Sequence, residues 1–508
     1  MQDAGHTFGN LFPRRFLWIL IGWCLFWTLI PMISLDSDFV DPLENIVWGS
    51  HFQFGYDKNP YLGAWLGYFL YKISGNSTWS VYLVAQIFVF TGVFATWRLA
   101  RKLLSEPMAA LAASSLLFIN FYGIKSVELC DDVMELGLWP MTILFFYKAL
   151  TEKHPMRDWL ICGFFCGCDL MVKYYAPFLF APMAAILLFT EEGRRAWKSA
   201  PIYLAGGILL LMSLPNILWL FNNDMVAIRY AFDRGGVSGQ KIPFMDHLEN
   251  PWDSLERTAG VFGIQLAAFA LCFFRRSEGF SRQAFNTRFV WLMTLGPYLL
   301  TLLFSLISGS RINYSWVLPC FSCLGIACFY FWQPKITSWN VRLHSLLLLA
   351  MALMFGIIFV VRSTYFQGYK KKRCDYENYP GREIALHLSK EWHRRFNSPL
   401  PYAIADRRGS CFLAIYSPDR PEAFFDGKTS LSPGIDMEDV LRKGAVLVCD
   451  VERGGLDALI ALFPKERITE VVTSDTHRAV PAWFRRFAGE PRKFQYRYCF
   501  LRPESDVK

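Results

Sequence analysis

Long apolar segments alternate with short polar loops through the first 361 residues of this 508-residue chain. A run of about 17 to 25 mainly apolar residues can cross a bilayer as a helix. The pattern predicts roughly eleven transmembrane helices, near residues 16–34, 80–97, 107–124, 133–150, 158–172, 176–191, 201–221, 258–274, 289–308, 315–333 and 341–361. Hydrophobic residues make up 53% of the chain, which fits a polytopic membrane protein.

Lys and Arg gather in every second loop, as expected when basic loops stay in the cytoplasm. Arg14 and Arg15 place the N-terminus inside, and the later inward loops hold Arg98, Arg101, Lys102, Lys148, Lys153, Arg157, Arg194, Arg195, Lys198, Arg275, Arg276, Arg282, Arg288, Lys335 and Arg342. The loops that begin at residues 35, 125, 173, 222, 309 and 362 then face outward, and they contain nearly all the acidic clusters. We therefore expect the chemistry on the outer side. The net charge of +9 comes from the inner loops and does not indicate nucleic acid.

After residue 361 the composition becomes that of a soluble domain. Residues 362–373 are rich in basic and aromatic side chains, which suits a lipid-headgroup boundary. Beyond them the pattern predicts helices at 382–396, 437–442 and 456–463 and strands at 402–406, 445–450, 470–473 and 494–501. We therefore expect a transmembrane domain at 1–361 and a small extracytoplasmic α/β domain at 362–508.

Thirteen cysteines are present, and most lie in or beside apolar segments, where a thiol fills space as a small apolar group. The other four, Cys374, Cys411, Cys449 and Cys499, lie in the soluble domain. In an oxidising compartment they are able to form up to two disulfides, and their spacing does not decide the pairing.

The first outward loop, residues 35–79, is acidic and aromatic. Asp41 is followed by Pro42 and, three residues on, by Glu44, which is the usual pattern of a helix N-cap with a capping box. A second short amphipathic helix is expected at 61–73, so that both helices lie on the membrane surface. Asp41 is our candidate for the carboxylate that activates or orients an acceptor, and Asp36 and Asp38 compete for this role.

Other outward loops carry further candidates. Glu128, Asp131 and Asp132 flank the start of the fourth span, where carboxylates are either functional or simply complement the helix dipole. Lys173 and Arg311 either bind a lipid-linked phosphate or snorkel from span ends. The long polar loop at 222–257, which includes Arg229, is either an active-site cover or a plain connector.

At these residues the chain resembles the polyprenyl-phosphate-dependent sugar transferases of the class C glycosyltransferase fold (GT-C). The similarity is to the bacterial branch related to protein O-mannosyltransferases and lipid A aminoarabinose transferases. Matching positions in the first loop are Asp41, Trp48, His51, Gly55, Tyr56, Pro60, Ala64 and Trp65. Further matches are Asp132 with Trp139, Lys173 with Tyr174, the segment Pro215, Asn216 and Trp219, and the short loop from Arg311 to Trp316.

The resemblance implies inverting transfer of a sugar from a polyprenyl (undecaprenyl) phosphate to lipid A, lipopolysaccharide or another envelope glycan, at the outer face of the bacterial inner membrane. It implies that Asp41 and Asp132 are catalytic and that Lys173 and Arg311 bind the donor phosphate. The cavity would be lined by Asp38, His51, Tyr56, Lys58, Asn59, Glu128, Asp131, Tyr174, Asn216, Arg229, Asn313 and Trp316. No cofactor and no metal are expected, although oligosaccharyltransferases of this fold use a divalent ion.

Three alternatives to this function remain open, the third being a non-catalytic scaffold. One is a protein O-glycosyltransferase of the same fold. The second, of a different class, is a lipid-linked-sugar flippase, which predicts ionisable residues deep within several spans. Asp169 is the main such residue in this chain. A non-catalytic scaffold would tolerate substitution of the acidic loops.

Overall fold

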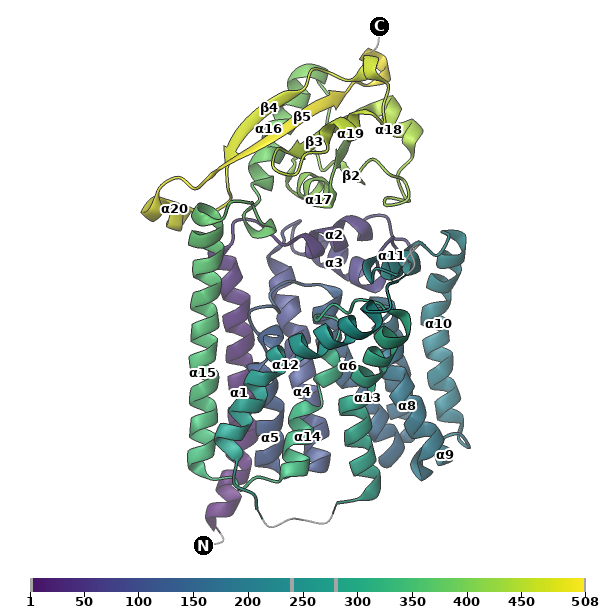
Figure 1. Ribbon diagram of the computed structural model, residues 1–508, viewed down its shortest axis with the longest axis vertical. Coiled ribbons are helices and arrows are strands. Elements are labelled where there is room, and N and C mark those ends of the chain that lie inside the picture. Colours follow the sequence, from purple (N-terminus) through teal and green to yellow (C-terminus); the bar gives the residue numbers. More distant parts are fainter. Residues whose placement is uncertain (1–2, 238–241, 278–281, 507–508) are drawn as a thin grey trace. The chain divides into compact units, whose positions relative to one another are not determined.

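The computed structural model describes residues 3–237, 242–277 and 282–506. The chain forms two compact units, and each is assembled from separate stretches of sequence (Figure 1). Unit 1 takes its described residues from 1–28, 58–63 and 82–356, whereas unit 2 consists of 29–57, 64–81 and the described part of 357–508. Most of the first loop therefore packs with the C-terminal residues. The predicted domain boundary at residue 361 does not separate the two units.

Unit 1 is helical, and each predicted span coincides with a helical segment. The segments are α1 (Asp3–Ser34), α4 (Trp79–Leu103), α5 (Glu106–Ser114), α6 (Asp131–Thr151), α7 (Pro155–Val172), α8 (Pro177–Phe189), α10 (Ala200–Asn222), α12 (Asp246–Phe273), α13 (Ala284–Ser308), α14 (Leu324–Trp332) and α15 (Ser338–Val361). Within the described residues, seven helices are long and apolar enough to cross a membrane, and shorter apolar helices occur at 106–118, 177–189 and 318–332. The last residues of α1 and α15 belong to unit 2.

Glycines bring the helices of unit 1 into close contact. A Cβ atom at Gly92 of α4 would lie 2.0 Å from the carbonyl oxygen of Leu136, and one at Gly137 of α6 would lie 2.7 Å from that of Phe88. The backbones of α4 and α6 therefore touch, as in other membrane helix pairs with small residues at the contact. This contact fixes α6, whose first turns carry the acidic residues considered below.

The loop at 222–257 is more ordered than a plain connector. It contains α11 (Val226–Arg234), and α12 begins at Asp246, before the predicted span at 258. Residues 238–241 of this loop lie outside the described residues.

The first loop forms α2 (Val40–Gly49) and α3 (Leu62–Ile73), close to the two predicted helices. The predicted N-cap was wrong, because α2 begins at Val40 and Phe39 occupies the cap position without a side-chain hydrogen bond. Pro42 is tolerated in the first turn, where its missing N–H has no intrahelical partner. Asp41 also lies in that turn, where the helix dipole favours a negative charge.

The C-terminal part of unit 2 contains one sheet with the strand order β2-β1-β3-β5-β4. The strands are β1 (Tyr402–Ala405), β2 (Glu422–Phe425), β3 (Ala445–Asp450), β4 (Val472–His477) and β5 (Lys493–Leu501). β2, β1 and β3 are parallel, and β5 is antiparallel to both β3 and β4. Ile404, Phe424 and Leu447 lie side by side and belong to the buried core.

The predicted α/β organisation is confirmed, with differences in detail. The helices α16 (Gly381–Phe396), α18 (Met437–Lys443) and α19 (Leu456–Ile460) match predictions, although α19 ends earlier than expected. β4 begins two residues later than the predicted start at 470. The structure adds α17 (Arg407–Tyr416), β2 and α20 (Ala482–Ala488), which are too short to give a clear hydrophobic period.

No disulfide links the cysteines that the structure describes. All thirteen cysteines lie in the described part of the chain and are free thiols. On the antiparallel pair β3 and β5, Cys499 faces Leu447 and Cys449 faces Arg497, so the two cysteines are not cross-strand partners.

Candidate active site

An arginine from the C-terminal residues binds the first loop within unit 2. Arg407, the first residue of α17, forms ion pairs with Glu44 of α2 and with Asp57. The side chains of Glu44 and Asp57 are almost fully buried, at 2% and 1% exposure. Burial disfavours the charged guanidinium, but the two carboxylates more than offset this and hold the pKa of Arg407 above its ordinary value. Glu44 therefore binds α17 and does not serve the predicted capping box.

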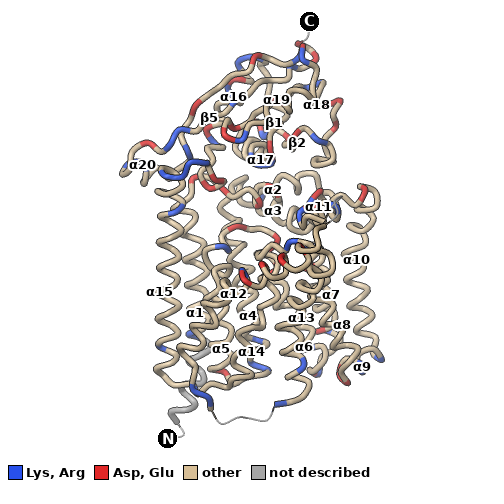
Figure 2. Tube along the Cα trace, viewed as in Figure 1, with Lys and Arg blue, Asp and Glu red and all other residues tan. Residues whose placement is uncertain are grey.

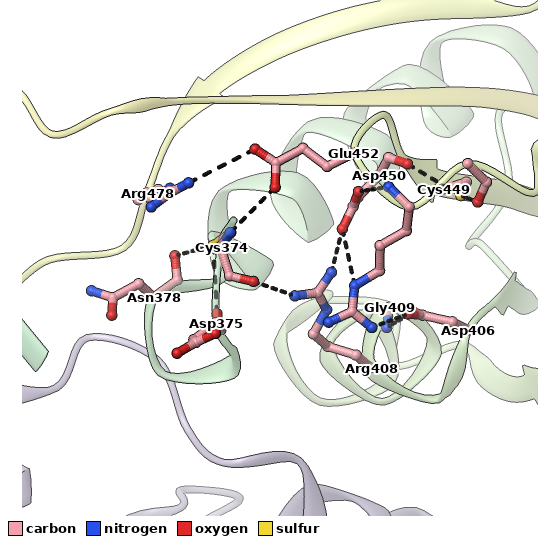
Figure 3. Close-up of polar contacts among 12 residues, drawn as sticks. Cys374, Asp375, Asn378, Asp406, Arg408, Gly409, Cys449, Asp450, Glu452 and Arg478 are labelled. Atoms are coloured by element: carbon pink, nitrogen blue, oxygen red, sulfur yellow. Dashed lines mark hydrogen bonds and ion pairs between the residues drawn. The ribbon is translucent and has the colours of Figure 1, made fainter. Parts of the chain in front are cut away.

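A network of polar contacts fixes the start of α17 (Figure 3). Asp406 caps α17 by accepting a 2.8 Å hydrogen bond from the N–H of Gly409. The neighbouring Arg408 is 2% exposed and pairs with Asp450 of β3 at 2.5 Å. Arg453 contacts both Asp406 and Asp450 at 3.5 Å. Because α17 is fixed at its start, Arg407 is held toward the loop.

Aromatic side chains complete this part of the site. The rings of Trp48 and Tyr56 stack at 5.4 Å, and the guanidinium of Arg407 lies 5.9 Å from the Trp48 ring. Burial raises the pKa of Tyr56, so this phenol stays protonated. A small pocket is lined by Val47, Trp48, His51, Gln53, Tyr56, Ala423, Phe425, Ser432, Pro433, Gly434 and Ile435. Two predicted cavity residues, His51 and Tyr56, thus share a pocket with the end of β2.

The three competing carboxylates of the first loop have different surroundings. Asp38 is 6% exposed and accepts a 2.5 Å hydrogen bond from the hydroxyl of Tyr416. Burial and the charge of Asp38 raise the pKa of Tyr416 well above its ordinary value, so this hydroxyl remains a donor. Asp36 is exposed and precedes α2, whereas Asp41 is partly exposed on the first turn of α2.

Unit 1 contains a second set of candidates around Lys173, which directly follows α7. Its ammonium group pairs with Asp132, lies 3.4 Å from Asp131 and lies 3.7 Å from Glu135. The carboxylates come from the first two turns of α6, and Glu135 is fully buried. Lys173 also lies 5.9 Å from the ring of Trp316. Its charge is thus already offset by three carboxylates, a feature that the sequence did not reveal.

The remaining predicted residues of unit 1 lie around this cluster or on exposed segments. The positive charge of Lys58 stabilises the carboxylate of Asp131. Tyr174 donates a 3.1 Å hydrogen bond to Asn216. Asn313 accepts a 3.2 Å hydrogen bond from the N–H of Ser315, which shapes the loop that carries Arg311. Both Arg311 and Arg229 are exposed, and Asn59 and Glu128 are partly exposed.

Several residues of these clusters were not among the predicted site residues. Glu44, Arg407 and Tyr416 connect the first loop to α17, and Glu135 pairs with Lys173. Glu135 had a detectable signal, because it follows Asp131 by four residues and so lies on the same helix face. The sequence carried no signal for the contacts of Arg407 and Tyr416, since these contacts depend on how α17 packs against α2.

Comparisons with known proteins agree with this description. The profile of the dolichyl-phosphate-mannose-protein mannosyltransferase family matches residues 58–219. The lipid A galacturonosyltransferase RgtD of Rhizobium johnstonii is 22% identical over 44% of this chain and 46% of its own length. An undecaprenyl phosphate-alpha-4-amino-4-deoxy-L-arabinose arabinosyl transferase of Edwardsiella ictaluri is 26% identical over 35% of this chain and 33% of its own. The matches therefore span less than half the length of these curated relatives.

The crystal structure of ArnT from Cupriavidus metallidurans bound to undecaprenyl phosphate has a similar fold. It superposes with a TM-score of 0.57 and 13% sequence identity, covering 91% of this chain and 96% of that one. The predicted GT-C fold, with its apolar helices and a small C-terminal sheet domain, is thereby confirmed.

Proposed function

We propose that this chain is an integral-membrane glycosyltransferase of the bacterial inner membrane that takes a sugar from a polyprenyl phosphate donor. Support comes from the fold shared with ArnT, from the family profile over residues 58–219, and from relatives that are glycosyltransferases by name. The protein would act as a multi-pass enzyme with its N-terminus in the cytoplasm and its C-terminal residues in the periplasm, and it would require no cofactor and no metal.

The observation that carries the catalytic assignment is the environment of Asp41. Asp38 and Glu44 are buried and bind Tyr416 and Arg407, so their oxygens are engaged in packing unit 2. Asp41 is the carboxylate of α2 that is partly exposed, on a helix otherwise buried along most of its length. A base must be reachable by the acceptor and must also be held rigidly, and Asp41 meets both requirements.

The proposed step is a single displacement. The acceptor hydroxyl oxygen forms a bond to the anomeric carbon while the bond from that carbon to the phosphate oxygen breaks. The polyprenyl phosphate leaves with the electron pair, the hydroxyl proton passes to Asp41, and the configuration inverts. Because negative charge grows on the departing phosphate, a positioned cation lowers the barrier. We assign this role to Arg311 first, since Lys173 already neutralises carboxylates of α6, one of which is the predicted catalytic Asp132.

Lipid A or the lipopolysaccharide core is our preferred acceptor. RgtD is by name a lipid A transferase, and RgtB of the same organism, 24% identical over 41% of this chain, is a lipopolysaccharide core transferase. The matched family profile is named for protein mannosylation, which keeps a secreted protein as the second candidate.

The test is a transfer assay with the purified protein in lipid nanodiscs. Radiolabelled undecaprenyl phosphate sugars are supplied with lipid A, with lipopolysaccharide core or with an envelope protein extract. We expect label in the lipid fraction and its loss in Asp41→Asn. Asp36→Asn is the matched control, because it removes a nearby exposed carboxylate, and it should retain transfer.

Each alternative gives a different result in this assay. Label in protein would replace the lipid acceptor by the second candidate. Full activity of Asp41→Asn would overturn the assignment of the base. Movement of donor across the bilayer without any transfer would support a flippase, and loss of activity in a chelator would contradict metal independence.

A further inference from the structure

The helix α20 exposes large apolar side chains together with a cation. It lies in the connection between β4 and β5, where Phe487 is 88% exposed and Trp483 is 51% exposed. Arg486, next to Phe487, is exposed as well. Aromatic and cationic side chains on one short helix are costly to expose to water alone but favourable at the boundary between lipid and water.

Contacts within unit 2 place α20 beside the ends of two candidate membrane spans. Trp483 donates a 2.7 Å hydrogen bond from its indole N–H to the carbonyl of Ile33, one residue before α1 ends. On the other span, Tyr369 contacts Phe484 ring to edge at 5.9 Å and donates a 2.6 Å hydrogen bond to the carbonyl of Gly489. Both helices are apolar and long enough to cross a bilayer, so their ends mark its boundary. Figure 1 shows α20 next to the end of α15.

The apolar surface continues from these span ends onto α20. The last turns of α1 and α15 expose Leu29, Met32, Ile33, Ile357, Ile358 and Val361, and Tyr365 and Phe366 follow α15. Side chains of this kind on a membrane span face lipid. α20 therefore extends a lipid-facing surface and is not an isolated patch.

Positive charge surrounds this surface. Figure 2 shows Lys and Arg on α20 and on the segments beside it. The exposed cations of this region include Arg362, Lys370, Lys372, Arg373, Arg486 and Arg492. Glu490 and Asp36 are exposed carboxylates of this region and Arg362 pairs with Glu377, but the exposed cations outnumber the exposed carboxylates. Such a surface complements the phosphate groups of anionic lipids.

We propose that α20 is a membrane-interface anchor. Trp483 and Phe487 insert at the boundary between headgroups and acyl chains, and Arg486 binds a lipid phosphate. The connection between β4 and β5 thereby fixes the sheet of unit 2 to the bilayer surface. This role is independent of the transfer chemistry proposed above.

The test uses the full-length protein with the photoreactive residue p-benzoylphenylalanine in place of Phe487. The protein is placed in nanodiscs of phosphatidylethanolamine and phosphatidylglycerol, irradiated, and analysed for lipid adducts by mass spectrometry. We expect lipid adducts at position 487. Leu462 is the matched control, because it is 48% exposed in the same unit but lies near α19, and the probe there should give none.

A second measurement tests whether the adduct yield depends on the charge of the lipids. Replacing phosphatidylglycerol by phosphatidylcholine should lower the adduct yield at position 487 by about fivefold. This dependence should disappear in Arg486→Glu and persist in Arg502→Glu, which changes an exposed arginine at the other end of β5. Absence of lipid adducts at 487, or equal yields at 487 and 462, would overturn the proposal. A protein adduct at 487 in native membranes, in place of lipid, would identify a protein-docking surface and also overturn it.

Discussion

Arg407 forms an ion pair with the buried Glu44 although 363 positions separate them in the chain. The same guanidinium binds Asp57, so one side chain holds both α2 and the end of the loop that follows it. The rigidity of the loop that carries Asp41 therefore depends on residues of the C-terminal domain.

Replacing Arg407 by Met should strongly destabilise unit 2. The substitution leaves two buried carboxylates without their cation, and breaking a buried pair in this way typically costs about 3 to 5 kcal/mol. Thermal unfolding of the purified protein measures the loss. Arg394→Met is the control, since this arginine is 69% exposed in its pair with Glu391, and it should cost less than about 1 kcal/mol. Equal effects of the two substitutions would contradict the role of Arg407.

A triple variant tests whether the loss of stability in Arg407→Met comes from uncompensated negative charge. Adding Glu44→Gln and Asp57→Asn to Arg407→Met removes the uncompensated charges, so part of the lost stability should return. If the triple variant is less stable than Arg407→Met alone, the carboxylates stabilise the fold by other contacts.

Tyr416→Phe should affect stability and leave the chemistry intact. It removes one hydrogen bond to buried Asp38, which we expect to cost about 1 to 3 kcal/mol. The dependence of the transfer rate on pH should not change, because the proposed base is Asp41. A shifted pH profile in Tyr416→Phe would instead point to Asp38 as the base.

Lys173→Met should lower the yield of folded protein, since Asp131, Asp132 and Glu135 would face one another without their cation. Adding Glu135→Gln removes one of these charges and should restore folding in part. Size-exclusion chromatography and thermal unfolding give the comparison. A Lys173→Met protein of normal stability with weakened donor binding would assign this lysine to the donor phosphate.

Arg311→Gln should raise the KM for the lipid-linked donor by about tenfold or more, because a charge-assisted hydrogen bond to phosphate is lost. Arg311→Lys should retain part of the binding. The matched control is Arg229→Gln, which also neutralises an exposed arginine of unit 1. If Arg229→Gln has the larger effect, the phosphate is bound at α11 and not in the loop of Arg311.

The stability of the sheet domain should fall in mild acid. Burial lowers the pKa of His387 below its ordinary value of 6.5, and its ring nitrogen hydrogen-bonds to Tyr496 at 2.7 Å. The unfolded chain then takes up a proton more readily than the folded one, so the stabilising effect is present above pH 6.5 and is lost as the pH falls through the lowered pKa. Hydrogen exchange of residues 381–396 and 493–501 should accelerate over this range, and less so in His387→Gln. Equal pH dependence in both proteins would exclude His387.

The sequence predicted the elements that carry a strong repeating pattern. Every apolar run coincides with a helical segment, and the predicted strand at 445–450 has the observed bounds, because both are continuous, mainly apolar stretches of sequence. Short elements such as α17 and β2 were not predicted, since a few residues show no clear hydrophobic period. Their positions are fixed by packing against β1 and α2, which is information that no local pattern contains.

In the candidate site, the sequence identified the charged residues correctly but did not identify which residues they contact. Asp132 was expected to be catalytic, Asp131 to line the cavity and Lys173 to bind the donor phosphate, yet the structure brings them into one ion-pair cluster. Likewise, Glu44 had the spacing of a capping box but binds Arg407. Spacing along a helix reports neighbours on that helix, whereas these contacts join residues far apart in sequence.

The discontinuous composition of unit 2 has a consequence for biogenesis. Asp57 leaves the ribosome 350 residues before Arg407. At about 5 to 20 residues per second, this delay is about 20 to 70 seconds. During that time Glu44 and Asp57 have no access to Arg407, so the loop that carries Asp41 is expected to reach its final packing only after nearly the whole chain has been translated and inserted. The final packing of the loop therefore depends on the synthesis of Arg407, late in translation.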